Sequence, residues 1–251
     1  KQGELADDTR QRVLEAIEQL GYRPSKVARA LVTQRTDTIG LLVGDIANPY
    51  FSEVASGVMD AAQAQEYDVF ICNTDDVREK RALFSLIDHN VDGAIIFPTF
   101  ENLTWLNEFS NPKQPMVLVN TTLEPHPGLG IVRSEIEKGA ELATNYLIEQ
   151  GHRCIGMIVG EVAPLNLIKR VAGYRSAIEN HGFVFHEDMV ILGEPQIAHG
   201  FEAAKLLFDR YSDLTAIVCY NDLLAMGAMQ RCKEMGLRIP EDCAITGYDN
   251  I

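Results

Sequence analysis

The sequence contains no long apolar segment among its 251 residues. No run approaches the ~18 residues that a membrane-spanning helix needs. The first four residues, Lys-Gln-Gly-Glu, also lack the apolar core of a secretory signal. We therefore expect a soluble, cytoplasmic protein with no membrane partner, unless a leader precedes residue 1.

Paired cysteines and metal-binding spacings are missing as well. The cysteines are odd in number and no two have C-x-x-C spacing, which argues against a disulfide framework or a zinc site. Of the histidines, only His181 and His186 lie near each other, in a predicted loop, and we interpret them as solvated. We expect neither a metal nor a cofactor. Four cysteines fall in apolar, strand-like segments and are predicted to be reduced core residues, namely Cys72, Cys154, Cys219 and Cys243.

Signatures of common enzyme classes are absent too. The sequence has no Walker A motif and no G-x-S-x-G elbow. The segment Gly128-Leu129-Gly130 follows Pro127 and opens no helix, so it predicts a turn and not a dinucleotide-binding loop. Carboxylates are plentiful, but sequence alone cannot pair two of them across a cleft, so a glycosidase is unsupported and not excluded. We expect a protein that is not an enzyme.

Charge is distributed unevenly along the chain. The net charge is −14, yet residues 1–36 hold seven basic and five acidic residues. Residues 21–36 hold four basic residues and no acidic one. Because a strongly acidic body repels nucleic acid, any DNA contact is expected in this short segment.

Apolar periodicity predicts helices and strands in alternation. A helix over residues 9–20 ends at Gly21, and a second, short helix covers 27–31. Strands are predicted at 39–43, 67–72, 93–97, 116–119, 154–159, 189–192, 216–219 and 244–246. Helices between them are predicted at 50–65, 77–90, 103–109, 135–150, 168–180, 200–210 and 221–235. This alternation is typical of parallel sheets with right-handed crossovers.

The pattern predicts the α/β class, with two doubly wound parallel-sheet lobes after a short helical segment. The expected boundaries are 1–36, 37–133 and 134–251, and the lobes should meet near residues 131–134. In such sheets ligands bind beyond the carboxyl ends of the strands. Two lobes should therefore share a ligand-binding cleft.

An ordered set of motifs resembles the LacI/GalR family of transcriptional regulators. The motifs are RVLEAIEQLGYRP at 12–24, ARAL at 28–31, TIGLLV at 38–43, DIANPYF at 45–51, VDGAII at 91–96, QGHRCI at 150–155, RVAGY at 170–174, NDLLAMGA at 221–228, GLRIP at 236–240 and GYDN at 247–250. Each motif is weak alone, but the ordered set covers nearly the whole chain and is specific. The resemblance implies a periplasmic-binding-protein-like type I fold and a repressor that is a homodimer.

For DNA binding, the resemblance implies that residues 12–24 end a helix-turn-helix headpiece and that residues 28–31 form a hinge helix. The recognition helix is expected upstream of residue 1 and the end of the N-terminal lobe beyond residue 251, so we interpret the chain as a fragment. A family leucine wedges between base steps in the minor groove, and Leu31 holds the matching position. Without the resemblance, Leu31 is an ordinary apolar residue of a connecting helix. The residues expected to meet operator phosphates are Arg23, Lys26, Arg29 and Arg35.

For effector binding, the resemblance implies that the lobes close around a small molecule, expected to be a sugar or sugar derivative. The expected cleft residues are Tyr50, Phe51, Asn166, Arg170, Asn221, Asp222 and Asp249. Asn221 could equally cap its helix, and Asp222 could stabilise a first helical turn.

The lobe junction departs from the family pattern. Asn120 stands where members often have Asp, and Arg133 lies where they have Asp-Asn. These two effector-site candidates could favour an anionic effector, although a solvated or salt-bridged Arg133 is the favoured interpretation. The alternative function is a sugar-binding protein of an uptake system, which would share the two-lobed fold.

Overall fold

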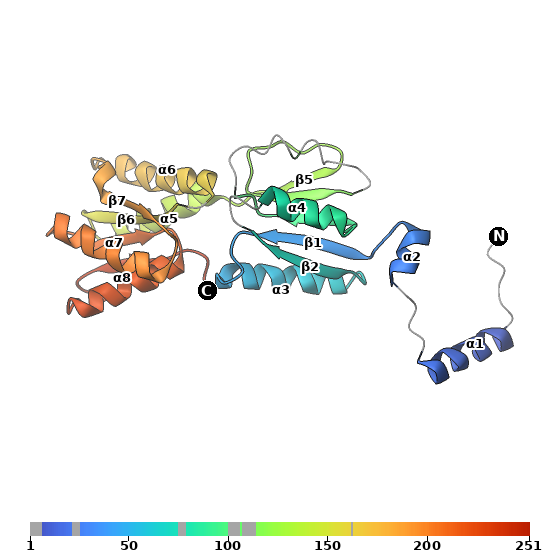
Figure 1. The fold of residues 1–251 in the computed structure, drawn as a ribbon. Helices are drawn as coiled ribbons and strands as arrows, with labels where there is room; N and C mark the ends of the chain where they lie inside the picture. The colour runs from blue at the N-terminus through green and yellow to red at the C-terminus, as the bar shows by residue number, and fades with distance from the viewer. Residues whose placement is uncertain (1–6, 22–25, 75–78, 100–105, 107–113, 162) are drawn as a thin grey trace.

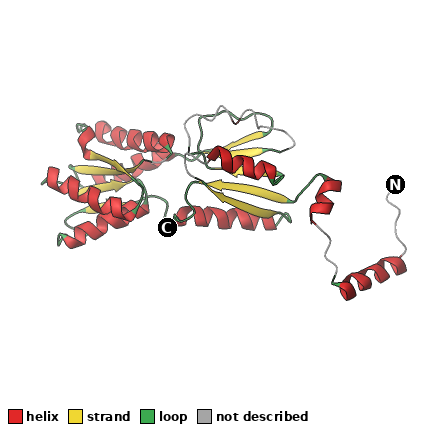
Figure 2. Cartoon of the chain, in the orientation of Figure 1, coloured by secondary structure: helices red, strands yellow, loops and turns green. Residues whose placement is uncertain are grey.

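The computed structural model describes residues 7–21, 26–74, 79–99, 106, 114–161 and 163–251. Its strands form two separate parallel sheets with helices packed on both faces of each (Figures 1 and 2). This is the predicted α/β architecture of two doubly wound lobes. One sheet lies within residues 37–133 and the other within 134–251, while the domain boundaries themselves stay a prediction.

The N-terminal lobe has the strand order β2-β1-β3-β4-β5, and every pairing is parallel. Its elements are β1 (Thr38–Val43), α3 (Pro49–Gln63), β2 (Asp68–Asn73), α4 (Glu79–Asp88), β3 (Gly93–Ile96), β4 (Met116–Val119) and β5 (Leu129–Val132). The helix predicted at 103–109 lies outside the described residues, apart from residue 106.

Strand β1 forms the centre of this lobe because both of its faces are apolar. Successive side chains of a strand point to opposite faces of the sheet. Leu42 packs in a cluster with Leu86 of α4, whereas Leu41 and Val43 pack with Ala55 of α3. Helices α3 and α4 therefore cover opposite faces, and the apolar run forms the doubly buried strand that was predicted.

Strand β5 corrects the prediction of a turn at 128–130. Gly128 does lie in a turn, with φ +90, but Leu129 and Gly130 already belong to β5, which pairs with β4. The site is close-packed, since a Cβ atom on Gly130 would lie 3.3 Å from a methyl group of Val117. The strand is short and contains glycine, so its sequence resembles a loop.

The C-terminal lobe has the strand order β7-β6-β8-β9, again with parallel pairings only. Its elements are α5 (Ile136–Glu149), β6 (Ile155–Gly160), α6 (Pro164–Asn180), the short 3-10 helix η2 (Glu187–Met189), β7 (Val190–Gly193), α7 (Ile197–Arg210), β8 (Ala216–Cys219), α8 (Asp222–Glu234) and β9 (Ala244–Thr246). Helix α6 begins earlier than predicted because Pro164 suits the first turn, ahead of the apolar pattern.

Glycines let the helices of this lobe pack very closely. A Cβ atom on Gly227 of α8 would lie 2.1 Å from the carbonyl oxygen of Ile197, and one on Gly200 of α7 would lie 2.2 Å from that of Leu224. Helices α7 and α8 therefore meet backbone to backbone. They cover one side of the sheet, and α5 and α6 cover the other (Figure 1).

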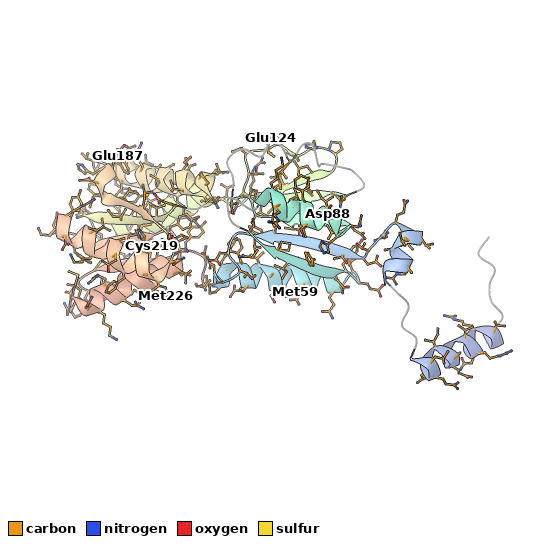
Figure 3. The ribbon with its side chains drawn as sticks, in the orientation of Figure 1. Met59, Asp88, Glu124, Glu187, Cys219 and Met226 are labelled. Carbon is orange, nitrogen blue, oxygen red and sulfur yellow. The ribbon has the colours of Figure 1, made fainter. Side chains whose placement is uncertain are left out.

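The cysteines are all free thiols, and three of them belong to the core. Cys219 and Cys243 are buried as predicted, and Figure 3 shows Cys219 inside the C-terminal lobe. Cys232 of α8 is also fully buried, which the sequence did not indicate. Cys72 and Cys154 are only half-buried, and burial raises the pKa of the Cys154 thiol to about 11. A thiol with so high a pKa is a weak nucleophile.

Two helices precede the lobes, α1 (Asp7–Leu20) and α2 (Lys26–Thr33). Helix α1 ends at Gly21, whose φ of +58 suits a helix C-terminus. Leu20 is 80% exposed, so the described residues leave the apolar face of α1 largely uncovered. Helix α2 lies at the end of the N-terminal lobe that is remote from the C-terminal lobe (Figure 1). Within the described parts of the chain, no helix combines the length and apolarity needed to cross a membrane.

Candidate ligand-binding cleft

A cleft of about 1340 Å³ lies between the two lobes. Its walls include residues that follow the carboxyl ends of β1, β3, β4, β6, β7, β8 and β9, which is where parallel sheets bind ligands. Of the nine sequence-predicted effector residues, the lining contains Tyr50, Phe51, Asn120, Asn166, Arg170, Asn221, Asp222 and Asp249. The fold therefore brings together residues that are far apart in the chain.

Three aromatic rings form the N-terminal wall of the cleft. Tyr50 and Phe51 lie in the first turn of α3, where the side chain of Asn48 accepts a hydrogen bond from the backbone N–H of Tyr50 at 3.1 Å. Phe97 follows β3 and meets both rings edge to face, with centroids 6.5 Å from Tyr50 and 5.4 Å from Phe51. This geometry stabilises the ring cluster and gives the wall an apolar surface.

Asn120 contributes a polar group where the chain approaches the second lobe. Its backbone φ is +57, a conformation that Asn tolerates better than most residues. Its Oδ1 accepts hydrogen bonds from the backbone N–H of Ser134 at 2.8 Å and from the Ser134 hydroxyl at 2.9 Å. A backbone N–H can only donate, which fixes the amide orientation. The Nδ2 group of Asn120 is therefore the part left to donate to a ligand.

Arg170 of α6 dominates the C-terminal wall. It is 6% exposed, and its guanidinium carbon lies 3.9 Å from the ring centroid of Tyr220 and 4.1 Å from that of Tyr248. The rings hold the guanidinium between them by cation–π attraction. Its Nη2 lies 3.9 Å from an Asp249 oxygen, and its buried Nε has no hydrogen-bond partner among the described residues.

The carboxyl group of Asp249 is strongly affected by its surroundings. Burial raises its pKa to about 6, Arg170 acts in the opposite direction, and Asp222 adds to the rise. Burial also raises the pKa of the Tyr50 and Tyr220 hydroxyls, so both remain protonated donors at neutral pH. The cleft thus contains a buried cation, a carboxyl group that titrates near pH 6 and neutral hydroxyls.

Asn221 and Asp222 line the cleft but also make structural bonds. The Oδ1 of Asn221 accepts from the Leu224 N–H at 2.9 Å and caps α8, as the alternative interpretation held. Asp222 lies in the first turn of α8, and its Oδ2 accepts from the backbone N–H of Ile251 at 2.9 Å. Asn166 of α6 interacts with the Tyr220 hydroxyl.

Arg133 is the predicted effector residue that the structure does not bring to the cleft. Its guanidinium donates to the carbonyl oxygens of Thr121 at 3.2 Å and Leu123 at 2.5 Å, and it pairs with Glu124 at 3.3 Å. Glu124 lies on the outer side of the N-terminal lobe (Figure 3). The salt-bridged interpretation fits Arg133 because three nearby acceptors satisfy its donors.

Several cleft residues were missed by the sequence-based prediction. Phe97 directly follows β3, and Tyr220 directly follows β8. Extending the strand predicted at 216–219 by one residue would have found Tyr220, and the strand predicted at 93–97 already ended on Phe97 without being assigned to the site, although ligands bind at that end. Met226, Met229 and Tyr248 also line the cleft, and no sequence signal separates the methionines from ordinary helix residues.

The predicted DNA-contacting residues that the structure describes lie on or next to α2, far from the cleft (Figure 1). Leu31 is 80% exposed, and Arg29 and Arg35 are exposed as well. Arg23 and the side chain of Lys26 lie outside the described residues. Described carboxylates, cysteines and histidines form no group of three that could hold a metal ion.

Comparisons with known proteins identify the family. Residues 36–251 match the family of periplasmic binding proteins and sugar binding domains of the LacI family. The transcriptional repressor PurR of Aliivibrio salmonicida is 35% identical over 251 residues, which cover 98% of this chain and 75% of that protein.

Two solved structures have the same fold. The transcriptional regulator CelR in complex with cellobiose is 27% identical and superposes with a TM-score of 0.74, covering 98% of this chain and 75% of that one. A LacI family regulator from Enterococcus faecium with bound ribose is 31% identical with a TM-score of 0.74, covering 85% of this chain and 78% of that one. The named relatives are regulators, which does not favour the uptake alternative. The chain therefore belongs to the LacI/GalR family of transcriptional regulators.

Proposed function

We propose that this protein is a DNA-binding repressor whose interlobe cleft binds a sugar or sugar derivative, and that this effector controls operator binding. The main support for the effector site is Arg170, a buried cation between two tyrosine rings, whose Nε has no hydrogen-bond partner among the residues that the structure describes. A buried donor without a partner costs about 1–3 kcal/mol. A ligand acceptor would remove that cost.

The chemistry of the cleft suits a ligand with several hydroxyl groups. Arg170 and the Nδ2 of Asn120 are donors on opposite walls, and Asp249 is an acceptor when ionised. Sugar hydroxyls both donate and accept, so one sugar can satisfy all three groups. The aromatic wall of Tyr50 and Phe51 can pack against the apolar face of a pyranose or furanose ring.

The type of effector is narrowed by two further observations. Bound ribose and bound cellobiose in two related regulators support a carbohydrate here. Arg133 bonds outside the cleft, so it gives no support to an anionic sugar. The aromatic wall also suits a planar nucleobase, which is the second candidate that a screen must include.

The test is calorimetry with neutral sugars, sugar acids, nucleosides and nucleobases, using the wild type and Arg170→Met. For the ligand that binds, Arg170→Met should weaken affinity at least about 30-fold, because a buried charge-assisted hydrogen bond is lost. Arg175→Met is the matched control, since it makes the same exchange on the same helix at a side chain that is 45% exposed. Unchanged affinity in a folded Arg170→Met protein would refute the assignment.

Effector binding is proposed to change the balance between open and closed lobe arrangements, and so the spacing of the DNA-binding segments in a dimer. A ligand that binds only the closed arrangement stabilises it in proportion to its differential affinity. Because a repressor must reach its operator DNA, we propose that the protein is cytoplasmic.

The DNA-binding surface is proposed to include the exposed Leu31 as a minor-groove wedge, with Arg23, Lys26, Arg29 and Arg35 on phosphates. An apolar side chain that is exposed on a short basic helix suits insertion between base steps.

A homodimer is proposed to form through the N-terminal lobe. Strand β2 is an edge strand that exposes Phe70 and Ile71, and the adjoining helix α3 exposes Met59, which Figure 3 shows on the outer side of the helix. Exposed apolar residues at a sheet edge favour association. Sedimentation velocity should show a dimer, and Ile71→Lys should shift it toward the monomer.

A further inference from the structure

The link between α2 and β1 is anchored by two carboxylates, Asp37 and Asp92. Asp92 lies just before β3, and its side chain is 16% exposed. Its Oδ1 accepts from the backbone N–H of Thr36 at 2.8 Å, and its Oδ2 accepts from that of Asp37 at 3.1 Å. One carboxylate thus binds two successive N–H groups of the link and fixes its backbone to the sheet.

The two described arginines that were predicted to contact DNA already bind these carboxylates. Arg29 of α2 donates from Nη2 to an Asp37 oxygen at 2.6 Å. The Nε of Arg35 lies 3.8 Å from Asp37 and 3.7 Å from Asp92, and its Nη2 donates to the Tyr67 hydroxyl. Each arginine can therefore meet a phosphate only by sharing or leaving an internal acceptor.

The Arg29–Asp37 pair is accessible enough to be exchanged. The Arg29 side chain is 57% exposed and that of Asp37 is 33% exposed. Exposed pairs of this kind are weak, and salt screens them. A DNA phosphate offers the same chemistry as the Asp37 carboxylate, namely an anionic oxygen acceptor for a guanidinium.

We propose that Asp37 is an internal competitor of DNA phosphate for Arg29, and that Asp92 is a positioning residue that fixes the link on which both arginines depend. Asp37 holds Arg29 when no duplex is bound and releases it to phosphate when the duplex docks. This competition rests on the proposed contact between Arg29 and DNA.

The first test compares the wild type with Asp37→Asn in the whole repressor, by fluorescence anisotropy with a random-sequence duplex at several salt concentrations. Asp37 has φ +50, a conformation that Asn adopts readily, so the exchange removes charge and keeps the backbone. We expect binding that is about two- to fivefold tighter at low salt, with the gain shrinking as salt rises. The control Glu179→Gln makes the same charge change on α6, in the other lobe, and should have a smaller effect.

A double-mutant comparison separates competition from general charge effects. Arg29→Gln alone should weaken DNA binding and reduce the salt dependence by about one phosphate contact. In the Arg29→Gln background, Asp37→Asn should lose most of its gain, because no guanidinium remains to be released. If Asp37→Asn raises DNA affinity equally with and without Arg29, or does not raise it at all, the competition is refuted. The proposed contact between Arg29 and DNA is not affected by that result. If Arg29→Gln changes neither affinity nor salt dependence, the DNA contact itself is wrong.

Asp92 is tested by hydrogen exchange together with DNA binding. Asp92→Ala should remove exchange protection at the amides of Thr36 and Asp37 and weaken DNA binding, about threefold or more. Asp92→Asn keeps one acceptor oxygen, so it should retain part of the exchange protection and part of the DNA affinity. Full protection of these amides in Asp92→Ala, or DNA binding equal to the wild type, overturns the positioning role.

Discussion

Replacement of Asp249 by Asn should remove a pH dependence from the stability of the ligand-free protein. The Asp249 side chain is 10% exposed, and burial raises its pKa from 3.8 to about 6. The folded protein therefore binds this proton more tightly than the unfolded chain does. Above about pH 6, Asp249 is ionised in the folded protein and its buried charge has its full destabilising effect. Between about pH 6 and 4, protonation of Asp249 removes this destabilisation. Stability should rise as the pH falls through this window.

The magnitude follows from the size of the pKa shift. A shift of about two units at ~1.4 kcal/mol each corresponds to ~3 kcal/mol, and water in the open cleft reduces the effect to about 1–3 kcal/mol. The pKa of Asp242 is lowered to about 2 by hydrogen bonds from Arg238, so its contribution is lost only below its ordinary value of 3.8. The window above pH 4 is thus free of that opposing effect.

The assay is urea unfolding of the ligand-free protein at about pH 7, 6 and 5. We expect the wild type to gain stability as the pH falls, and Asp249→Asn to show a flatter profile. Asn tolerates the positive φ of 104 at this position, and Arg170 keeps a polar neighbour. Asp60→Asn on the exposed side of α3 is the control and should follow the wild type. Parallel profiles for the wild type and Asp249→Asn would refute the reasoning.

Three further predictions test other parts of the molecule. Leu31→Ala should weaken operator binding about tenfold in anisotropy titrations, and unchanged affinity would exclude the wedge. Gly227→Ala should destabilise the fold by ~2–3 kcal/mol in urea unfolding, because its Cβ would lie 2.1 Å from the Ile197 carbonyl oxygen, whereas Gly57→Ala has open space and should stabilise by up to ~1 kcal/mol. Arg133→Gln should leave effector affinity within about twofold by calorimetry, since the Arg133 guanidinium bonds outside the cleft. A larger loss of affinity would show that Arg133 contacts the effector.

Much of the fold was predictable because parallel strands bury both faces. The run over 39–43 could not be stable on a surface, and it became β1 within one residue of the prediction. Strand β5 was missed because it is short and glycine-containing, so that only its pairing with β4 defines it as a strand. The start of α6 was missed because the apolar pattern begins after its first turn.

The candidate site was predictable in its residues and not in its chemistry. Motif resemblance identified Arg170, but only the tertiary structure placed it between Tyr220 and Tyr248, with no partner for its Nε within the described parts of the chain. The tertiary structure also showed that Arg133 bonds outside the cleft, where three acceptors of a neighbouring loop satisfy its donors.

By itself, the sequence determined the class of fold, the family and the acidic body with its basic segment over residues 21–36. These properties depend on local periodicity, ordered motifs and charge, all of which follow directly from the order of residues in the chain. The tertiary structure decided which donors face the cleft, why the pKa of Asp249 is raised and which carboxylates hold Arg29 and Arg35. Those properties depend on burial and on distances between residues far apart in sequence, which exist only once the chain has folded.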